Sequence, residues 1–222
     1  MSEMLDHESS QDLVIVKETS DAILQRLDWM LMQPKKILVL DQFSNLLKSE
    51  FQKKYPQVEI LSESNDADML CANLILPWQQ NLAAVLKAWK QCIKSEGIVM
   101  FSAFGPDTLK EWGGEFQNSS CVHLIDMHDL GDALVQAGFC DPVLDVEYFT
   151  LNYRNKKQFL DELKAMKILH KDAVTELEEE TYPATFEMIY VHAWVPDAET
   201  FTANEDGVTK VPLNYLREKL RG

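Results

Sequence analysis

The first 96 residues of this 222-residue chain contain no glycine; its eight glycines lie between Gly97 and Gly222. Loops that hold the phosphate or sugar groups of a nucleotide depend on glycine, because the backbone has to approach the ligand closely. The sequence therefore excludes a glycine-built nucleotide loop from its first 96 residues.

Basic residues are also scarce. The chain has 21 Lys and Arg against 36 Asp and Glu, a formal net charge of −15. Nonspecific binding to nucleic acid needs a basic surface, and an anionic membrane repels an acidic one, so we expect neither partner. Two local basic groups could contact an acidic partner protein, although solvated surface is the simpler interpretation. They are Lys87, Lys90 and Lys94, at helical spacing, and Arg154, Lys156 and Lys157.

Long hydrophobic runs and paired cysteines are absent as well. The longest apolar runs, such as Ile37–Leu40, are far shorter than the roughly 20 residues of a membrane span. Met1–Asp12 is acidic and lacks the features of a signal peptide. The four cysteines have neither a CxxC motif nor paired spacing, which favours buried, reduced thiols. These features predict a cytoplasmic protein.

Apolar segments of strand length alternate with amphipathic helices in the first half of the chain. Strands are predicted over Lys36–Asp41, Val58–Leu61, Asp68–Leu76 and Ile98–Phe104. Helices are predicted from Ile23 to a stop at Pro34, over Asn45–Tyr55, and over Asn81–Ser95 with Gly97 as its C-terminal stop. Fully apolar strands between helices indicate a parallel sheet that is covered on both faces.

The second half predicts an antiparallel end to the same sheet. Val143–Leu151 and Glu187–Val195 alternate as strands do, with a helix over Asn155–Ile168 between them. Further helices are predicted over Asp107–Glu115 and Met127–Ala137, the second closed by Gly138. The whole pattern predicts an α/β fold with a doubly wound, mostly parallel sheet. We expect one domain over residues 21–195, a partly flexible acidic segment over 1–20, and a tail over 196–222 that packs on the domain or leaves it.

The turn after the first strand is where an open α/β sheet of this kind binds its ligand. Asp41 is followed by Gln42 and then by Phe43, a bulky residue at a place where close approach of a ligand needs glycine. Ser44 or Asn45 can cap the next helix. The turn is therefore interpreted as serving the fold rather than a nucleotide-type ligand.

One group of side chains has the composition of a metal site: His123, Asp126, His128 and Asp129. The two aspartates already fit the start of the helix Met127–Ala137, and no second ligand cluster accompanies them. We therefore expect no metal.

Several strings of this chain resemble the malonyl-acyl-carrier-protein O-methyltransferases of biotin synthesis, which are class I S-adenosylmethionine (SAM) methyltransferases. The strings are Asn73–Trp78 (NLILPW), Val99–Leu109 (VMFSAFGPDTL), Leu124–Ala133 (LIDMHDLGDA), Gly138–Pro142 (GFCDP) and Pro183–Trp194 (PATFEMIYVHAW). The resemblance covers most of residues 21–195 and implies the class I methyltransferase fold.

The chain departs from the family where the family binds SAM. The family has an Asp-x-Gly-x-Gly-x-Gly loop after its first strand; Asp41 is retained without the glycines, and Glu63 only approximates the acid that bonds the ribose. Six residues separate Val58–Leu61 from Asp68–Leu76, where the family has a helix, a third strand and an adenine-contacting Asp. The resemblance therefore implies a six-stranded sheet in the order 2-1-4-5-7-6 in the family's strand numbers, with the third strand and a flanking helix missing.

Three functions are compatible with this resemblance. The leading hypothesis is a degenerate homologue without a cofactor, which acts as a binding or regulatory partner, for example of an acyl carrier protein. The alternative is an active enzyme that binds SAM and methylates a malonyl thioester, and the second alternative is a subunit of a dimer formed through the shortened sheet edge. The residues implied are Asp41, Glu63 and Asn73 for SAM, Gly105, Asp107 and Thr108 for substrate or partner, and Lys87, Lys90, Lys94, Arg154 and Lys157 for an acidic partner.

Overall fold

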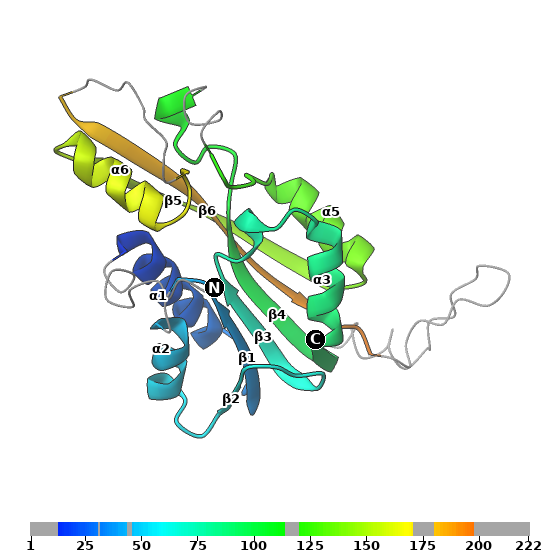
Figure 1. The fold of residues 1–222 in the computed structure, drawn as a ribbon. Coiled ribbons are helices and arrows are strands. Elements are labelled where there is room, and N and C mark those ends of the chain that lie inside the picture. The colour runs from blue at the N-terminus through cyan, green and yellow to red at the C-terminus, as the bar shows by residue number, and fades with distance from the viewer. Residues whose placement is uncertain (1–12, 31, 44–45, 114–119, 171–179, 198–222) are drawn as a thin grey trace, which may run out of the picture.

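The computed structural model describes residues 13–30, 32–43, 46–113, 120–170 and 180–197. Its elements in chain order are α1 (Val14–Asp28), β1 (Lys36–Asp41), α2 (Leu46–Lys54), β2 (Glu59–Leu61), β3 (Ala67–Asn73), η1 (Leu76–Trp78), α3 (Leu82–Gln91), β4 (Ile93–Phe104), η2 (Lys110–Trp112), α5 (Met127–Ala137), β5 (Cys140–Tyr153), α6 (Lys156–Ala165) and β6 (Tyr182–Trp194). Figure 1 shows these elements around one twisted sheet.

The sheet has six strands in the order β2-β1-β3-β4-β6-β5. Strands β1 to β4 are parallel to one another, whereas β6 runs antiparallel to both β4 and β5. This order is the predicted one, since β3, β4, β6 and β5 correspond to the family's strands four, five, seven and six. The predicted α/β class and the antiparallel end of the sheet are confirmed.

The helices form a layer on each face of the sheet. Helices α1, α2 and α6 lie on one face and α3 and α5 on the other, as the two opposite views show. Each layer encloses its own hydrophobic core: Met100 of β4 belongs to the α1 side, and its neighbour Phe101 belongs to the α3 side. Because successive residues of a strand point to opposite faces, the fully apolar strands serve both cores.

The connection from β2 to β3 is unusually short for a link between parallel strands on opposite sides of β1. Such links take a dozen or more residues and usually contain a helix, whereas residues 62–66 suffice here (Figure 1). Side chains near the end of the connection bind the start of β1: Asp66 pairs with Lys36, and Asp68 accepts the backbone N–H groups of Lys35 and Lys36 at 2.7 and 2.8 Å. These contacts stabilise the crossover without a helix.

Helix α1 begins at Val14 and packs into the core from its first turn. Ile15 and Ser20 are fully buried, so the packed structure starts before residue 21. Arg26, near the end of the helix, is buried against the sheet, where it pairs with Asp145 and Glu147 of β5. The division of the chain into segments 1–20, 21–195 and 196–222 stays a prediction, and residues 198–222 lie outside the described residues.

Two local predictions are wrong. Gly97 does not stop a helix: α3 ends at Gln91, and Gly97 lies inside β4, where a Cβ atom would be 2.9 Å from the carbonyl oxygen of Asp68 on β3. Glycine is needed there because two strands approach closely. The helix predicted over Asp107–Glu115 is, in its described part, a turn followed by η2. In contrast, the helix Met127–Ala137 is confirmed, with Asp126 as its N-cap and Gly138 at φ 91° after its end.

Candidate functional site

The candidate site lies at the carboxyl ends of β1 and β3, where the strand order changes direction and where open α/β sheets bind their ligands; this position is called the crevice below. Asp41 ends β1 and Asn73 ends β3, and the two residues are direct neighbours across the sheet. The structure therefore brings together two of the three residues predicted for a cofactor. The third, Glu63, follows the edge strand β2 in an exposed turn.

The Asp41 carboxylate organises the turn that follows β1. Its oxygens accept hydrogen bonds from the backbone N–H groups of Phe43, at 3.3 Å, and of Leu47 in the first turn of α2, at 3.2 Å. A carboxylate at this position satisfies N–H groups that a helix leaves unpaired and interacts favourably with the helix dipole. Asp41 thus positions α2 by binding the backbone N–H group of Leu47 in that helix.

Asn73 is the centre of a buried hydrogen-bond network. Its amide nitrogen donates to the carbonyl oxygen of Val16 at 3.2 Å and to the Ser20 hydroxyl at 3.0 Å, both on α1. Its amide oxygen accepts from the Ser102 hydroxyl of β4 at 2.7 Å, and Ser102 in turn accepts from the backbone N–H of Leu74. Asn73 is fully buried and both of its amide hydrogens have internal acceptors, so it joins α1 to β3 and β4.

Aromatic side chains pack against one another at this edge of the sheet. Phe43, 8% exposed, lies edge-on against Trp78 with ring centroids 5.1 Å apart, and Trp78 contacts Phe104 in the same manner at 5.9 Å. The Trp78 indole N–H donates to the carbonyl oxygen of Lys167 at 2.9 Å. Phe43 therefore packs on Trp78, which follows β3, in the place where the resemblance implies a glycine.

Strand β3 also carries a fully buried thiol, that of Cys71. Burial raises the pKa of Cys71 above its ordinary range, and the Asp41 carboxylate raises it further. The thiol stays protonated at neutral pH, so Cys71 is unsuited to nucleophilic chemistry. Among the described residues, no group of three His, Cys, Asp or Glu side chains could hold a metal ion.

The residues predicted for substrate form a tight turn at the end of β4. Glu187 of β6 holds this turn: its carboxylate accepts the N–H of Asp107 at 2.6 Å, and its backbone exchanges hydrogen bonds with the Thr108 hydroxyl at 3.2 and 3.3 Å. A Cβ atom at Gly105 would be 2.5 Å from a Glu187 carboxylate oxygen. Gly105 is thus explained by the approach of Glu187, a residue that the sequence analysis did not single out.

The signal for Glu187 was present in the sequence. It is the one charged residue in the apolar stretch Phe186–Val191, and two of the strings that carry the resemblance, FGPDTL and PATFEMIY, meet in this contact. A carboxylate in a strand that is otherwise buried needs hydrogen-bond donors. Its donor here lies 80 residues earlier in the chain, which no local pattern indicates.

Of the three lysines predicted to form one basic helix face, Lys87 and Lys90 are on α3 but Lys94 is not. Lys87 is exposed on α3, whereas the Lys90 ammonium lies against the backbone at Gly138, where it would contact an added Cβ. Lys94 is in β4 rather than in α3, because the helix ends early, and it pairs with Asp68. The prediction of a continuous Lys87, Lys90 and Lys94 surface is wrong.

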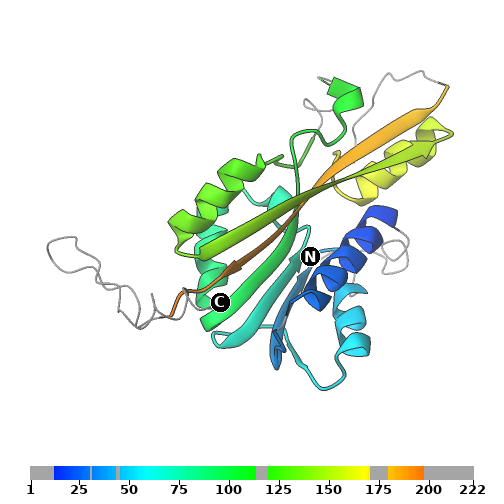
Figure 2. The same ribbon diagram turned by 180° about the vertical axis from the view of Figure 1, so that it is seen from behind.

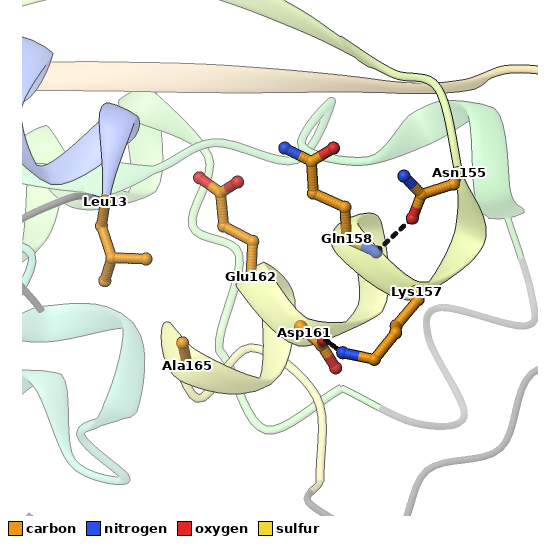
Figure 3. Close-up of a pocket in the computed structure, with 7 residues that line it drawn as sticks. All are labelled: Leu13, Asn155, Lys157, Gln158, Asp161, Glu162 and Ala165. Atoms are coloured by element: carbon orange, nitrogen blue, oxygen red, sulfur yellow. Dashed lines mark hydrogen bonds and ion pairs between the residues drawn. The ribbon is translucent and has the colours of Figure 1, made fainter. Parts of the chain in front are cut away.

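The second basic group surrounds the start of α6. Asn155 caps the helix by accepting the N–H of Gln158 at 2.8 Å, Arg154 is exposed, and Lys157 pairs with Asp161 one turn later. A shallow cavity of about 460 Å³ lies between this helix and Leu13 at the start of α1; Figure 3 shows Gln158 and Glu162 projecting from the same side of α6. Lys157 lines this cavity and stays exposed beside Asp161, and Arg154 is the exposed neighbour of Asn155, another lining residue.

Known proteins similar in sequence to this chain carry the name of the family that the sequence analysis identified by resemblance. A malonyl-[acyl-carrier protein] O-methyltransferase of Gallionella capsiferriformans is 28% identical and aligns with 91% of this chain and 90% of its own length. The protein of the same name from Halorhodospira halophila is 26% identical, with coverage of 94% and 90%. That of Methylovorus sp. is 37% identical over 65% of this chain and 56% of its own length. The resemblance to proteins of this name is confirmed.

The alignment with the Gallionella protein also indicates that this chain lacks segments that the relative has. It extends over 264 positions, more than the 222 residues of this chain, so the relative contains stretches that have no counterpart here. No protein-family model matches the chain.

Solved structures agree on the fold. A protein of Bacillus halodurans assigned as a methyltransferase superposes with a TM-score of 0.56 at 14% identity, over 80% of this chain and 98% of its own. A chain from the complex of the Haloferax volcanii Trm112 methyltransferase activator with a methyltransferase gives 0.54 at 10% identity, over 87% and 94%. The chain has the class I methyltransferase fold. In the part of the chain that is described, no helix is long and apolar enough to cross a membrane.

Proposed function

We propose that this protein is a methyltransferase-like homologue of the malonyl-acyl-carrier-protein O-methyltransferases that has lost the SAM motif and acts by binding or regulating another protein. The observation that carries the proposal is the packing of Phe43 on Trp78. A cofactor-binding version of this fold needs the backbone at this turn to approach the ligand. The Phe43 ring occupies that approach instead.

The polar residues of the crevice support the same proposal. Asp41 binds the backbone of its own turn, and Asn73 binds α1 and Ser102. A methyltransferase accelerates its reaction chiefly by holding two substrates in contact, so loss of one subsite removes this contribution. Without SAM the fold retains the exposed start of α6 and, in the turn 105–108, the exposed Pro106 and the half-buried Asp107 as surfaces for a partner; Gly105 and Thr108 are buried.

Isothermal titration of the full chain with SAM and with S-adenosylhomocysteine tests the proposal. We expect no binding of either compound up to millimolar concentration, with the Gallionella relative as a control for the quality of the ligands. Micromolar binding would contradict the proposal. It would favour the alternative of an active O-methyltransferase on a malonyl thioester, with Asp41, Glu63 and Asn73 near the cofactor and the Gly105–Thr108 turn near the substrate.

The partner that we propose is an acyl carrier protein, which is acidic. Arg154 and Lys157 are its candidate contacts, because Arg154 is exposed and the Lys157 side chain is 86% exposed, whereas Lys94 pairs with the largely buried Asp68. Opposite charges at a rim chiefly accelerate association, and salt weakens the effect. Reversal of both charges (Arg154→Glu, Lys157→Glu) should weaken binding measured by surface plasmon resonance, whereas Lys87→Glu should not. Equal binding by both variants would remove this surface from the proposal.

A dimer, a cytoplasmic location and a role in biotin synthesis remain predictions. Strand β2 is a three-residue edge of the described sheet, which a second chain could extend. A monomeric mass in solution at high concentration would contradict the dimer. Deletion of the gene followed by growth without biotin would contradict a required role in that pathway.

A further inference from the structure

A second cavity lies on the α1 face of the sheet, away from the crevice. It has a volume of about 270 Å³ and is enclosed by the end of α1 and by β5 and β6, which Figure 2 shows on one face of the molecule. Its apolar wall is formed by Trp29, Met30, Met100 and Val143, and His192 lies beside them. Burial lowers the pKa of His192, so the imidazole is neutral at pH 7 and adds little charge to this wall.

The apolar wall is strongly exposed at its rim. Trp29 is 75% exposed and Val143 is 50% exposed, and only three other large hydrophobic side chains among the described residues are comparably open. An exposed Trp beside an apolar hollow has the character of a binding hot spot, because the ring can bury a large area at little entropic cost. The two exposed side chains flank the same cavity.

The other side of the cavity is lined by Arg26 and Asp145, and Glu147 lies beside this lining. Arg26 lies over the ring of Tyr190, 3.8 Å from its centroid, and serves two carboxylates, Asp145 and Glu147. The side chains of these two carboxylates are 52% and 44% exposed. One guanidinium neutralises one of two negative charges, so the rim keeps a surplus carboxylate that a cationic side chain can meet from solvent.

One segment of this chain has the matching chemistry. Residues 210–221, KVPLNYLREKLR, contain four basic residues and one acidic residue among five large apolar or aromatic ones, in a chain whose net charge is −15. This segment lies outside the described residues. Charge and hydrophobicity therefore both favour it as the occupant of an acidic, apolar cavity.

The chain also reaches the cavity. Strand β6 ends at Trp194, next to Cys140 at the start of β5, and its continuation is held where the Ser95 hydroxyl donates to the carbonyl oxygen of Pro196. His192, which lines the cavity, is five residues before Asp197, a separation of at most about 18 Å along the chain. A chain of twelve residues, the length of 198–209, can span at most about 40 Å, which exceeds this separation.

We propose that residues 210–221 dock on the cavity between α1 and β5 of the same chain, with basic side chains toward Asp145 and Glu147 and apolar side chains against Trp29 and Val143. The proposal does not depend on whether SAM binds. The test distinguishes this proposal from two other results: docking of a segment from a second copy of the chain, and no docking at all.

Zero-length carbodiimide cross-linking of the full chain tests the contact directly, because it joins lysine amines only to carboxylates that touch them. We expect Lys210 or Lys219 to be linked to Asp145 or Glu147 and the links to disappear in 1 M salt, where the screening length falls to about 3 Å. Mixing isotopically labelled and unlabelled chains distinguishes links within one chain from links between copies. Absence of these links, or links between copies, would overturn the proposal.

A second measurement follows Trp29. In the variant Arg217→Glu, Lys219→Glu, Arg221→Glu the segment is repelled, so acrylamide should quench the Trp29 fluorescence more strongly than in the unmodified chain. The Trp29 signal is obtained by subtracting that of the corresponding Trp29→Phe protein. A control with the same change in net charge, Lys87→Glu, Lys156→Glu, Lys164→Glu, should leave the quenching unchanged. Equal quenching in the two triple variants would contradict docking at Trp29.

Discussion

The turns after β1 and after β4 lie at the same edge of the sheet but are built by opposite means. After β1, Asp41 binds backbone N–H groups within its own turn, and the bulky Phe43 packs into the crevice. After β4, the binding carboxylate comes from Glu187 on another strand, and Gly105 provides the space for it. The difference teaches that Gly105 accompanies close approach by another strand's side chain, and that the glycine-free turn after β1 is held by its own Asp41 and packed by its own Phe43.

The largest effect is expected from Gly105→Ala. The new Cβ atom would lie 2.5 and 2.7 Å from atoms of the Glu187 side chain, which would have to release the N–H of Asp107. Overpacking costs about 1–3 kcal/mol and the lost hydrogen bond about 1 kcal/mol, so we expect the free energy of unfolding to fall by about 3 kcal/mol. Urea unfolding followed by circular dichroism measures this change.

Gly131→Ala is the matched control for that experiment. Gly131 lies inside α5, and its Cβ atom would meet only Leu144, at an ordinary 3.5 Å. Alanine is favoured over glycine within a helix by about 0.5–1 kcal/mol, so this variant should be slightly more stable. If Gly105→Ala behaves like Gly131→Ala, then Glu187 does not hold the turn and the contrast between the two turns is lost.

An intermediate effect is expected from Phe43→Ala. The variant loses the edge-on contact with Trp78 and leaves a void beside that ring. Because Phe43 lies at the mouth of the crevice, where neighbours can adjust, we expect a loss of about 2–3 kcal/mol, at the lower end of the range for buried phenylalanine. Urea unfolding gives the value. Phe43→Leu keeps most of the volume and should lose less than about 1.5 kcal/mol; a larger loss in Phe43→Leu than in Phe43→Ala would contradict the packing role.

The sequence predicts the sheet better than it predicts the contacts within the site. Strand order follows from alternating apolar segments and from the resemblance, and the helix Met127–Ala137 follows from its local caps, Asp126 and Gly138. Gly97 is misassigned because its role depends on Asp68 of a neighbouring strand. Asn73 is placed correctly at the crevice, but its partners on α1 lie 53 and 57 residues away, so their identity required the folded structure.

The smallest of these effects, and one that depends on pH, is expected at the shortened crossover, which belongs to the glycine-free half. Burial alone would raise the pKa of Asp68, but hydrogen bonds from Lys94 and from the N–H groups of Lys36 and Lys35 outweigh burial and lower it. Asp68→Asn weakens these bonds and should reduce the free energy of unfolding by about 1 kcal/mol at pH 7. The measurement is urea unfolding over a series of pH values.

The sign of the pH dependence follows from the direction of the shift. A carboxyl whose pKa is lowered by folding stabilises the protein above its unfolded pKa, about 3.9 for Asp, and this contribution is lost as the pH falls through the lower, folded value. The difference between Asp68→Asn and the unmodified chain should therefore be constant from pH 7 to 5 and shrink below about pH 4. Asp66→Asn, which removes only an exposed pair with Lys36, should have a smaller effect at every pH. A difference for Asp68→Asn that grows as the pH falls would show that the carboxylate does not hold the start of β1, and the glycine-free half would then owe its crossover to packing alone.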